Sequence, residues 1–405
     1  MLADSLTADS LTCYPYKMER RNVGILGATG MVGQRFIQLL ADHPWFNITW
    51  LAASDRSAGK TYAEACAWRL DTPLPARIAQ MVLQPNTPEL AAREANGESA
   101  LPRIIFSSVD APIARELEPL FAAAGCAVIS NSSAFRMAPD VPLVVPEVNA
   151  DHLALIEQQP TRRVSKGNTP SGGYIVTNPN CCAIGLVLPL APLQTRFGIE
   201  KLFVSTMQAV SGAGYPGVAS LDILGNLIPY IKNEEEKLQE EVAKLLGSAS
   251  TTGFQPAPLT LSAHCNRVAV VDSHTECVSI KLRKPATHAE ILAAWADFQP
   301  LHGKGGLANI AGLHLPSAPL LPVEYAPEET RPQPRLDLMR GNGMATTVGR
   351  LRPCTLFDWK FTLLSHNTIR GAAGAAILNA EILAVMGKFD FRAFPAIQSN
   401  QLVQA

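Results

Sequence analysis

Two adjacent cysteines, Cys181 and Cys182, immediately precede an apolar run of the chain. Asn178 suits a helix N-cap and Pro179 the first helical position, which predicts a helix with its apolar body over 183–193. Cys181 then lies in the first turn, where free N–H groups and the helix dipole favour a thiolate. Such a thiolate can attack a carbonyl carbon while the N–H groups stabilise the oxyanion. The alternative is a pair of small buried residues, which fits Cys182 better.

A histidine and an arginine flank a second apolar run further along the chain. Arg267 is predicted to open a strand over 266–271, with His274 at its polar end before the next strand, 277–282. A histidine there can exchange a proton with a thiol near neutral pH. The planar guanidinium of Arg267 binds carboxylates in a bidentate manner, which indicates an anionic substrate. An isolated histidine is also common as a surface or capping residue.

Charged residues gather on a helix predicted to run from 234 to 246. Glu234 and Lys237 are three residues apart and therefore lie on one face of it. From periodicity alone, a solvated charged face is the preferred interpretation.

A glycine turn lies near the start of the chain, between a strand over 22–26 and a helix that continues through Leu40. Gly27, Gly30 and Gly33 allow close approach to a pyrophosphate at the helix N-terminus. The spacing is G-x-x-G-x-x-G rather than the usual G-x-G-x-x-G, and a plain tight turn is the alternative.

The next strand, predicted over 48–53, ends in a polar turn. Ser54, Arg56 and Ser57 suit a ribose 2′-phosphate and favour NADP, whereas Asp55 would suit the ribose hydroxyl of NAD. A solvated turn explains these residues equally well.

The remaining elements indicate how these residues are positioned. Strands over 104–107 and 127–130 with a helix over 113–124 predict parallel crossovers and a doubly wound sheet. After an exposed loop over 158–173, strands over 202–209, 266–271 and 277–282 have the hairpin-like spacing of a mostly antiparallel sheet. The six prolines of 316–334 predict an irregular arm, and 371–386 an Ala-rich helix.

Composition narrows the class of protein. The 405 residues are enough for two domains, and 47% hydrophobic with 17% charged residues excludes a disordered chain. A net charge of −1 predicts no nucleic-acid or membrane partner, and we expect no bilayer-spanning segment. The eight cysteines form no CxxC pair, which favours a reducing, cytoplasmic setting without a metal site. The tandem repeat within residues 1–20 predicts a disordered tail, or an initiator at Met18.

In this order, the motifs resemble the aspartate-semialdehyde dehydrogenase family, in its archaeal and fungal branch, from Asn22 to about Met386. The matching stretches are GILGATGMVGQRF, SNSSAFRM, LVVPEVN, TNPNCCAIGL, MQAVSGAGYPG, NEEEKLQEE, CNRVAVVDSHTECV, RPQPRLD and SHNTIRGAAGAA. The resemblance implies an α/β fold like that of glyceraldehyde-3-phosphate dehydrogenase. It has a Rossmann-type NADP-binding domain (21–178 plus 366–405) and an α+β catalytic and dimerisation domain (179–365) with a mostly antiparallel sheet. A homodimer or homotetramer is expected.

The resemblance also implies a role for each matching residue. Cys181 matches the nucleophile that forms a thioester, His274 the acid/base, and Gln208 the residue that orients the reacting group. The substrate-binding positions are Arg267 for the α-carboxylate, Glu234 for the amino group, and Arg136, Lys237 and Asn180 for the phosphate pocket. The implied NADP(H) contacts are Gly27, Thr29, Gly30, Met31, Val32, Gly33, Ser54, Arg56, Ser57, Ser211, Gly212 and Asn367.

The implied reaction is the NADPH-dependent reductive dephosphorylation of 4-phospho-L-aspartate to L-aspartate 4-semialdehyde and phosphate, in lysine, threonine and methionine biosynthesis. One position departs from the family, because Cys182 stands where Ser or Thr is usual, and a thiol is a poorer hydrogen-bond donor. This difference concerns the placement of the Cys181 side chain rather than its identity as the nucleophile.

Three alternative functions share parts of this pattern. A malonyl-CoA reductase shares the nucleophile and the NADP site, and Glu234 is the position that discriminates against it. An N-acetyl-glutamyl-phosphate reductase is disfavoured because the nucleophile stretch here reads Asn-Cys-Cys-Ala-Ile. A non-enzymatic NADP-binding sensor would lack Cys181 or His274, and both are present.

Overall fold

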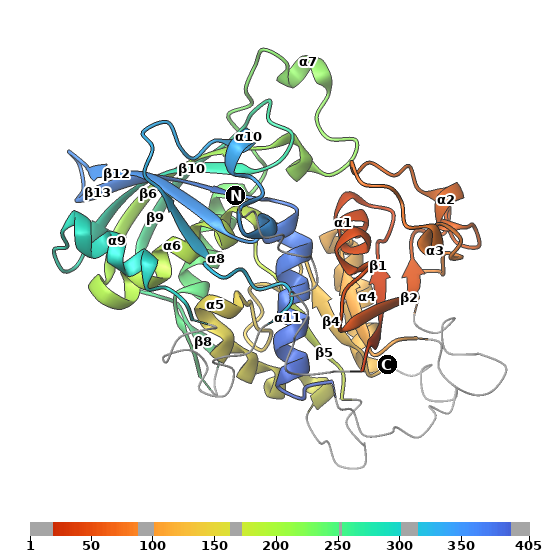
Figure 1. The fold of residues 1–405 in the computed structure, drawn as a ribbon. Coiled ribbons are helices and arrows are strands. Elements are labelled where there is room, and N and C mark those ends of the chain that lie inside the picture. The colour runs from red at the N-terminus through yellow and green to blue at the C-terminus, as the bar shows by residue number, and fades with distance from the viewer. Residues whose placement is uncertain (1–18, 88–100, 163–171, 251–252, 301–314, 390–405) are drawn as a thin grey trace, which may run out of the picture.

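The computed structural model describes residues 19–87, 101–162, 172–250, 253–300 and 315–389, which form two sheets with their helices (Figure 1). Most of the expected N-terminal tail, residues 163–171 of the expected loop, and residues 390–405 lie outside the described part. Within that part, no helix combines the length and the apolar character that crossing a membrane requires.

The first sheet is parallel and has the strand order β2-β1-β3-β4-β5. Its strands are β1 (Arg21–Leu26), β2 (Phe46–Ala52), β3 (Ile104–Ser107), β4 (Ala127–Ser130) and β5 (Tyr174–Thr177). Every residue of the last three strands is buried, as expected of a parallel sheet with helices on both faces. The predicted doubly wound sheet is confirmed.

The helices of this half include one from much later in the chain. α11 packs its apolar side chains, among them Ile377 and Leu378, into the same core as Val23 and Ile25 of β1. It lies beside α1 and the first sheet (Figure 1). The helices here are α1 (Met31–Leu40), α2 (Tyr62–Ala65), α3 (Ala76–Ala79), α4 (Ala111–Ala123), α5 (Pro146–Asn149), the 3₁₀ helices η2 (Ala150–Gln158) and η3 (Pro160–Arg162), and α11 (Gly374–Val385).

The second sheet has six strands in the order β11-β12-β13-β10-β6-β9. The central pairs are antiparallel, whereas β9 runs parallel to β6 and β11 parallel to β12. The strands are β6 (Ile199–Gln208), β9 (Thr260–Arg267), β10 (His274–Leu282), β11 (Val323–Ala326), β12 (Thr346–Pro353) and β13 (Trp359–Ser365). Three of the five strand pairs are antiparallel, so the predicted mostly antiparallel sheet is confirmed, with a parallel pair at each edge.

One face of the second sheet is covered by α6, whose residues 182–193 are all buried. Alternate residues of β10, such as Val278 and Ile280, point into this core. The other elements of this half are α6 itself (Cys181–Phe197), η4 (Val210–Ala213), α7 (Ser220–Ile223), α8 (Glu234–Leu245), β7 (Ser248–Ser250), β8 (Gly253–Gln255), α9 (His288–Ala296), α10 (Pro334–Asp337) and η5 (Arg340–Gly343). The π-helix η6 (Ile369–Ala373) directly precedes α11 and contributes Ile369 and Ala373 to the core of the first half.

The predicted strand over 266–271 is wrong after Arg267, and the hairpin-like spacing does not make 266–271 and 277–282 neighbours. β9 ends at Arg267, and β6 lies between β9 and β10. The apolar residues that follow use their backbone elsewhere: the carbonyls of Val270 and Val271 accept from the N–H groups of Val210 and Ser211. An apolar run with β propensity therefore forms a loop, because its hydrogen-bond partners lie in the segment after β6 rather than in a neighbouring strand.

The predicted irregular arm over 316–334 is partly wrong. It contains β11, a short edge strand that fits between Pro322 and Pro327. Proline is tolerated at the ends of an edge strand because it interrupts no internal ladder there.

Candidate active site

Cys181 is the first residue of α6 and is half-buried. The N-cap is Asn180 rather than the predicted Asn178, and its Oδ1 accepts hydrogen bonds from the N–H groups of Cys182 and Ala183 at 2.8 and 3.2 Å. Asn178 instead continues from β5, because its N–H donates to Ser130 O and its amide to Asn131 Oδ1. The predicted position of Cys181 in the first turn is confirmed, with the helix start shifted by two residues.

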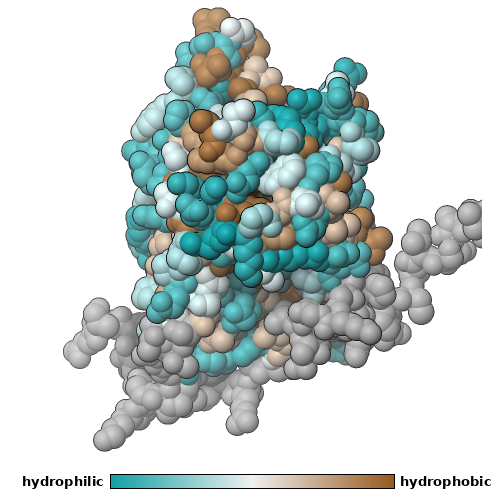
Figure 2. Space-filling view, turned by 90° about the vertical axis from the view of Figure 1, so that its left-hand side faces the viewer, coloured by the Kyte–Doolittle hydropathy of each residue, from teal (hydrophilic) through white to brown (hydrophobic). Residues whose placement is uncertain are grey.

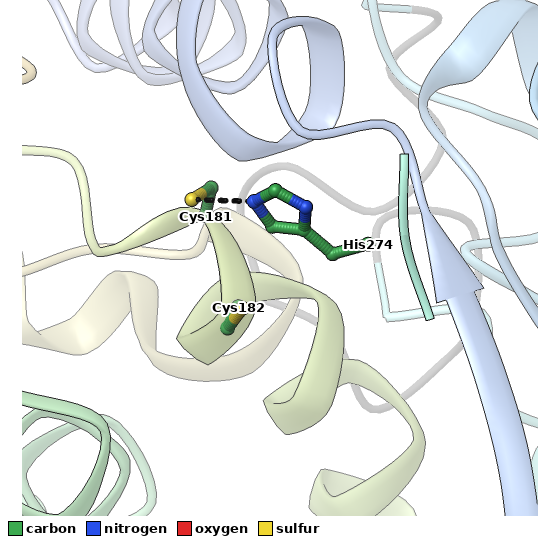
Figure 3. A group of neighbouring side chains, drawn as sticks. All are labelled: Cys181, Cys182 and His274. Atoms are coloured by element: carbon green, nitrogen blue, oxygen red, sulfur yellow. Dashed lines mark hydrogen bonds between the residues drawn. The ribbon is translucent and has the colours of Figure 1, made fainter. Parts of the chain in front are cut away.

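His274 is fully buried and faces the cysteine (Figure 3). It is the first residue of β10, rather than lying at the end of a preceding strand as predicted. Its Nε2 lies 3.1 Å from Cys181 Sγ, and its Nδ1 accepts a hydrogen bond from the N–H of Ala209 at 3.1 Å. Because Nδ1 is an acceptor, the proton of the neutral ring resides on Nε2 and is directed at the sulfur.

Three predicted site residues stand in one row across the second sheet. His274 pairs with Gln208 in the antiparallel β6–β10 ladder, and Gln208 pairs with Arg267 in the parallel β6–β9 ladder. All three are buried. The backbone of Ala209 links Arg267 to His274, because its carbonyl accepts from Arg267 Nη1 at 2.8 Å and its N–H donates to His274 Nδ1. The sheet register therefore gathers residues that are far apart in the sequence.

The electrostatic surroundings favour a thiolate at Cys181. The neighbouring Cys182 thiol, followed by His274 and Arg136, holds the pKa of Cys181 well below its ordinary value, against the effect of burial. Burial raises the pKa of Cys182 well above its ordinary value.

The sulfur atoms of Cys181 and Cys182 and a ring nitrogen of His274 lie within 4.8 Å of one another, a grouping compatible with a metal ion. A histidine that binds a metal through Nε2 carries its proton on Nδ1 and donates it to a carbonyl or carboxylate. Here Nδ1 faces the N–H donor of Ala209. The histidine is therefore oriented to donate to the sulfur rather than to bind a metal.

Four of the five predicted substrate-binding residues, all except Arg267, form one connected network along α8. Asn180 Nδ2 donates to Glu234 Oε1 at 2.8 Å, and Lys237 Nζ lies 3.9 Å from Glu234 Oε2. Glu241, two turns further on, accepts from Arg136 Nη1 at 2.9 Å and from the Asn180 N–H at 2.6 Å. Glu234 is buried, so the interpretation of this face as solvated is wrong for that residue.

A buried lysine of the same helix holds the segment that carries Arg136. Lys244 Nζ donates to the carbonyls of Arg136, Ala138 and Val141 at 2.7, 3.0 and 3.1 Å. Burial lowers the pKa of Lys244 to about 8. The three carbonyls nevertheless satisfy all three protons of the ammonium group, which fixes the chain beside the cysteine.

The predicted cofactor residues of the first sheet lie at the C-terminal ends of two adjacent strands. The glycine turn, with Gly27 at φ +80°, follows β1, and Ser54 follows β2, whose Ala52 pairs with Leu26. A Cβ on Gly33 would lie 2.3 Å from Gly27 O, so this position accepts no side chain. The N-cap Gly30 has no side chain to bond the first N–H groups of α1, and no acidic residue occupies that turn.

The predicted cofactor residues of the second half also lie together, next to the histidine. Asn367 Nδ2 donates to Ser211 Oγ at 2.8 Å, and Asn367 Oδ1 accepts from the N–H of Ser273. A Cβ on Gly212 would lie 3.1 Å from His274 Cε1 and 2.9 Å from an Arg267 nitrogen. The backbone of Gly212 thus packs directly on the catalytic candidates.

The π-helix η6 lies directly against Cys181. A Cβ on Gly371 would lie 2.7 Å from the Cβ of Cys181, so only glycine fits there. The residue before it, Arg370, makes a bidentate ion pair with Glu147 at 2.7 Å for both contacts, fully buried.

Sequence reasoning missed two acidic residues of this region. Glu241 lies within the NEEEKLQEE stretch, seven residues after Glu234 and hence on the same helix face, a spacing that was available as a signal. Glu276, two residues after His274 on β10, is fully buried, and strand alternation was the signal that it shares the inner face with the histidine.

Comparison with known proteins gives the family. Residues 22–156 match the model of the semialdehyde dehydrogenase NAD binding domain, and residues 190–370 match that of the semialdehyde dehydrogenase dimerisation domain. Aspartate-semialdehyde dehydrogenases of Archaeoglobus fulgidus and Methanothermobacter thermautotrophicus are 47% and 49% identical, over 90% and 89% of this chain and 98% of each relative. The crystal structure of aspartate semialdehyde dehydrogenase with NADP from Candida albicans matches with a TM-score of 0.79 and 42% identity, over 92% of this chain and all of that one. The chain belongs to the aspartate-semialdehyde dehydrogenase family.

Proposed function

We propose that this protein catalyses the NADP-dependent interconversion of 4-phospho-L-aspartate and L-aspartate 4-semialdehyde, a step in the biosynthesis of lysine, threonine and methionine. The observation that carries the proposal is the 3.1 Å contact between Cys181 Sγ and His274 Nε2. Gln208 and Arg267 stand in line with it on the same sheet, and this constellation combines a nucleophile, a proton donor and a carboxylate-binding group.

The proposed chemistry begins with attack of the Cys181 thiolate on the acyl carbon of the acyl phosphate. The new C–S bond forms as the C–O bond to phosphate breaks, and phosphate leaves toward Arg136 and Lys237. In the later hemithioacetal, the His274 Nε2–H donates a hydrogen bond to the oxyanion. The oxyanion then collapses to the aldehyde as the C–S bond breaks and Cys181 leaves as a thiolate.

Substrate recognition is proposed to rest on two opposite charges. Arg267 binds the α-carboxylate through the guanidinium edge not used by Ala209 O, and Glu234 binds the amino group. Both side chains are buried, so their interactions with substrate are strengthened by the exclusion of water. A malonyl thioester would offer no amino group to Glu234.

The cofactor is proposed to be NADP(H), which supplies a hydride when bound. The turn from Gly27 to Gly33 fits a pyrophosphate, because its backbone leaves room and the first N–H groups of α1 point out of the helix end. Ser54, Arg56 and Ser57 are proposed to hold the 2′-phosphate, with Ser211, Gly212 and Asn367 near the nicotinamide end.

Replacement of Arg56 tests the preference for NADP. Arg56 is exposed after β2, so Arg56→Ala removes a charge without disturbing the core. We expect the KM for NADP⁺ to rise about tenfold, as for loss of one charge-assisted hydrogen bond, while the KM for NAD⁺ stays unchanged. Arg77→Ala, which also alters an arginine of this half, is the control. An equal change for both cofactors would show that Arg56 does not bind the 2′-phosphate.

The function itself is tested by following the absorbance of NADPH. With L-aspartate 4-semialdehyde and NADP⁺, we expect reduction that depends on added phosphate. The absence of this activity, combined with NADPH oxidation on malonyl-CoA, would reassign the substrate and leave the nucleophile in place.

We propose an NADP-binding domain of 21–178 plus 366–405 and a catalytic and dimerisation domain of 179–365, because α11 shares its core with the first sheet. All seven cysteines in the described part are free thiols, which fits the proposed reducing, cytoplasmic setting.

A homodimer is proposed, in part because an apolar surface is exposed around α7. Leu221, Leu224 and Tyr230 are 90%, 68% and 67% exposed, and apolar residues gather at the top of the molecule, at the height of α7 (Figure 2). Exposed apolar patches of this kind mark interaction surfaces.

We expect Leu221→Lys/Leu224→Lys to shift the protein from dimer toward monomer in sedimentation velocity. The control Leu356→Lys, at an exposed leucine elsewhere, is expected to keep the dimer. A dimer unaffected by the double change would place the interface elsewhere.

A further inference from the structure

Glu241 is a buried acid of α8 that the proposed mechanism does not use. Its side chain is 2% exposed, and its two carboxylate oxygens accept hydrogen bonds from two different parts of the chain. Oε1 accepts from Arg136 Nη1 at 2.9 Å, and Oε2 accepts from the backbone N–H of Asn180 at 2.6 Å. One carboxylate therefore joins the arginine that is proposed to bind phosphate to the residue that directly precedes Cys181.

The guanidinium of Arg136 is held at two of its nitrogens. Besides the contact with Glu241, its Nη2 donates to the carbonyl of Asn131 at 2.7 Å. Lys244, three residues after Glu241 on α8, fixes the backbone carbonyl of Arg136 as well. These contacts use only part of the N–H donors of the guanidinium and fix its plane, so a phosphate group meets the remaining donors in one orientation.

The backbone of Asn180 is held in the same way at the start of α6. The Asn180 side chain caps the first turn of the helix through Oδ1 and donates from Nδ2 to Glu234 Oε1 at 2.8 Å. Its own N–H precedes the helix, where no intrahelical carbonyl accepts it, and Glu241 Oε2 takes that place. The contact thus fixes the N-cap from which Cys181 projects toward His274.

Both partners of Glu241 are donors, so this position requires two acceptor oxygens. A carboxylate supplies them, whereas the amide of glutamine would direct its NH₂ group at one of the donors. Burial raises the pKa of Glu241, and Arg136 and the Asn180 N–H oppose this effect. Aspartate would keep the charge and both acceptors, but it is one methylene shorter and would not span the two contacts.

We propose that Glu241 is a positioning residue that holds the phosphate-binding guanidinium of Arg136 and the N-cap of α6 in one fixed arrangement. A phosphoryl group bound at Arg136 is thereby kept in a constant position relative to Cys181 when the thiolate attacks the acyl carbon. The inference rests on the proposed roles of Arg136 and Cys181. It gives Glu241 a geometric role beyond that of a counter-charge.

The test is the protection of Cys181 by inorganic phosphate against alkylation by iodoacetamide, followed by mass analysis of the modified peptide. It uses the full chain and needs neither turnover nor cofactor. We expect Glu241→Asp to need about tenfold more phosphate for half-protection, as for one lost hydrogen bond between charged groups. Without phosphate, this variant should be alkylated more slowly than the parent, because a loosened N-cap stabilises the thiolate less.

The matched control is Glu240→Asp, the same change at the exposed neighbour on α8. It should keep the protection and the alkylation rate of the parent. In the enzyme assay, the KM for phosphate should rise in Glu241→Asp while the KM for NADP⁺ stays unchanged. An equal rise in both constants would indicate general damage to the structure and contradict a positioning role.

Glu241→Gln separates geometry from charge. A counter-charge alone predicts tighter phosphate binding in Glu241→Gln, because Arg136 loses its neutralising partner, and parent-like binding in Glu241→Asp. The positioning role predicts weaker binding in both variants. If Glu241→Gln does not fold, Glu241→Asp decides alone, and parent-like protection in it would overturn the proposal.

A failure of the proposed function has a different signature. If phosphate does not protect Cys181 in the parent either, Arg136 and Lys237 form no phosphate pocket, and the role of Glu241 falls with it. Protection that is equal in the parent and in Glu241→Asp would leave the pocket in place and reject only the role of Glu241.

Discussion

Replacement of Cys181 by alanine is expected to lower turnover at least about ten-thousand-fold, because it removes the atom that forms the covalent intermediate. Cys181→Ser should lose nearly as much, since a hydroxyl at this position stays protonated where the thiol ionises. Activity is measured as phosphate-dependent NADP⁺ reduction with L-aspartate 4-semialdehyde. Ordinary turnover in Cys181→Ala would refute the proposed mechanism.

The lowered pKa of Cys181 leads to a second prediction, which is tested by alkylation rather than by turnover. In the parent protein, Cys181 should react with iodoacetamide at pH values below those at which an ordinary thiol reacts, because its thiolate persists there. Cys277→Ala is the matched control: Cys277 is exposed on the face of β10 that points away from α6. This variant should keep both the turnover and the early alkylation.

Breaking the buried ion pair between Arg370 and Glu147 is expected to have the largest effect on stability. The two side chains are 0% and 1% exposed and make two contacts of 2.7 Å. Arg370→Met or Glu147→Gln alone leaves one group uncompensated in the core, which we expect to lower the free energy of unfolding by about 3–5 kcal/mol. Thermal and denaturant unfolding measure this change.

The double variant Glu147→Gln/Arg370→Met distinguishes the pair from general damage to the core. With both charges gone, much of the lost free energy of unfolding should return. Turnover should fall in the single variants as well, because Arg370 anchors the π-helix whose Gly371 lies against Cys181. Single variants as stable as the parent would contradict the assigned role of the ion pair.

Much of this site was open to prediction because its signals are local. The glycine turn before α1 and the cysteines at the start of α6 depend on residues within one or two turns of each other. The helix start itself was misplaced by two residues, since Asn178 and Asn180 are both good caps in sequence. Only the tertiary contact of Asn178 with Asn131 decides between them.

The parts that escaped prediction depend on long-range pairing. No local pattern shows that β6 inserts between β9 and β10, yet this order is what aligns Arg267, Gln208 and His274. For the same reason the apolar residues after Arg267 look like strand and form a loop. Strand alternation places Glu276 on the same face as His274, but the sequence does not show that α6 covers this face and buries the acid.

The position of α11 has a consequence for synthesis on the ribosome. The five strands of the first sheet emerge early, but the helix that completes their core follows the whole second sheet. A domain at the start of a nascent chain usually folds as soon as it has left the exit tunnel. Here the apolar face that contacts Ile377 and Leu378 stays exposed until both residues have been synthesised. We therefore expect the first half to complete its folding only after the second half has been synthesised, and to bind chaperones during that interval.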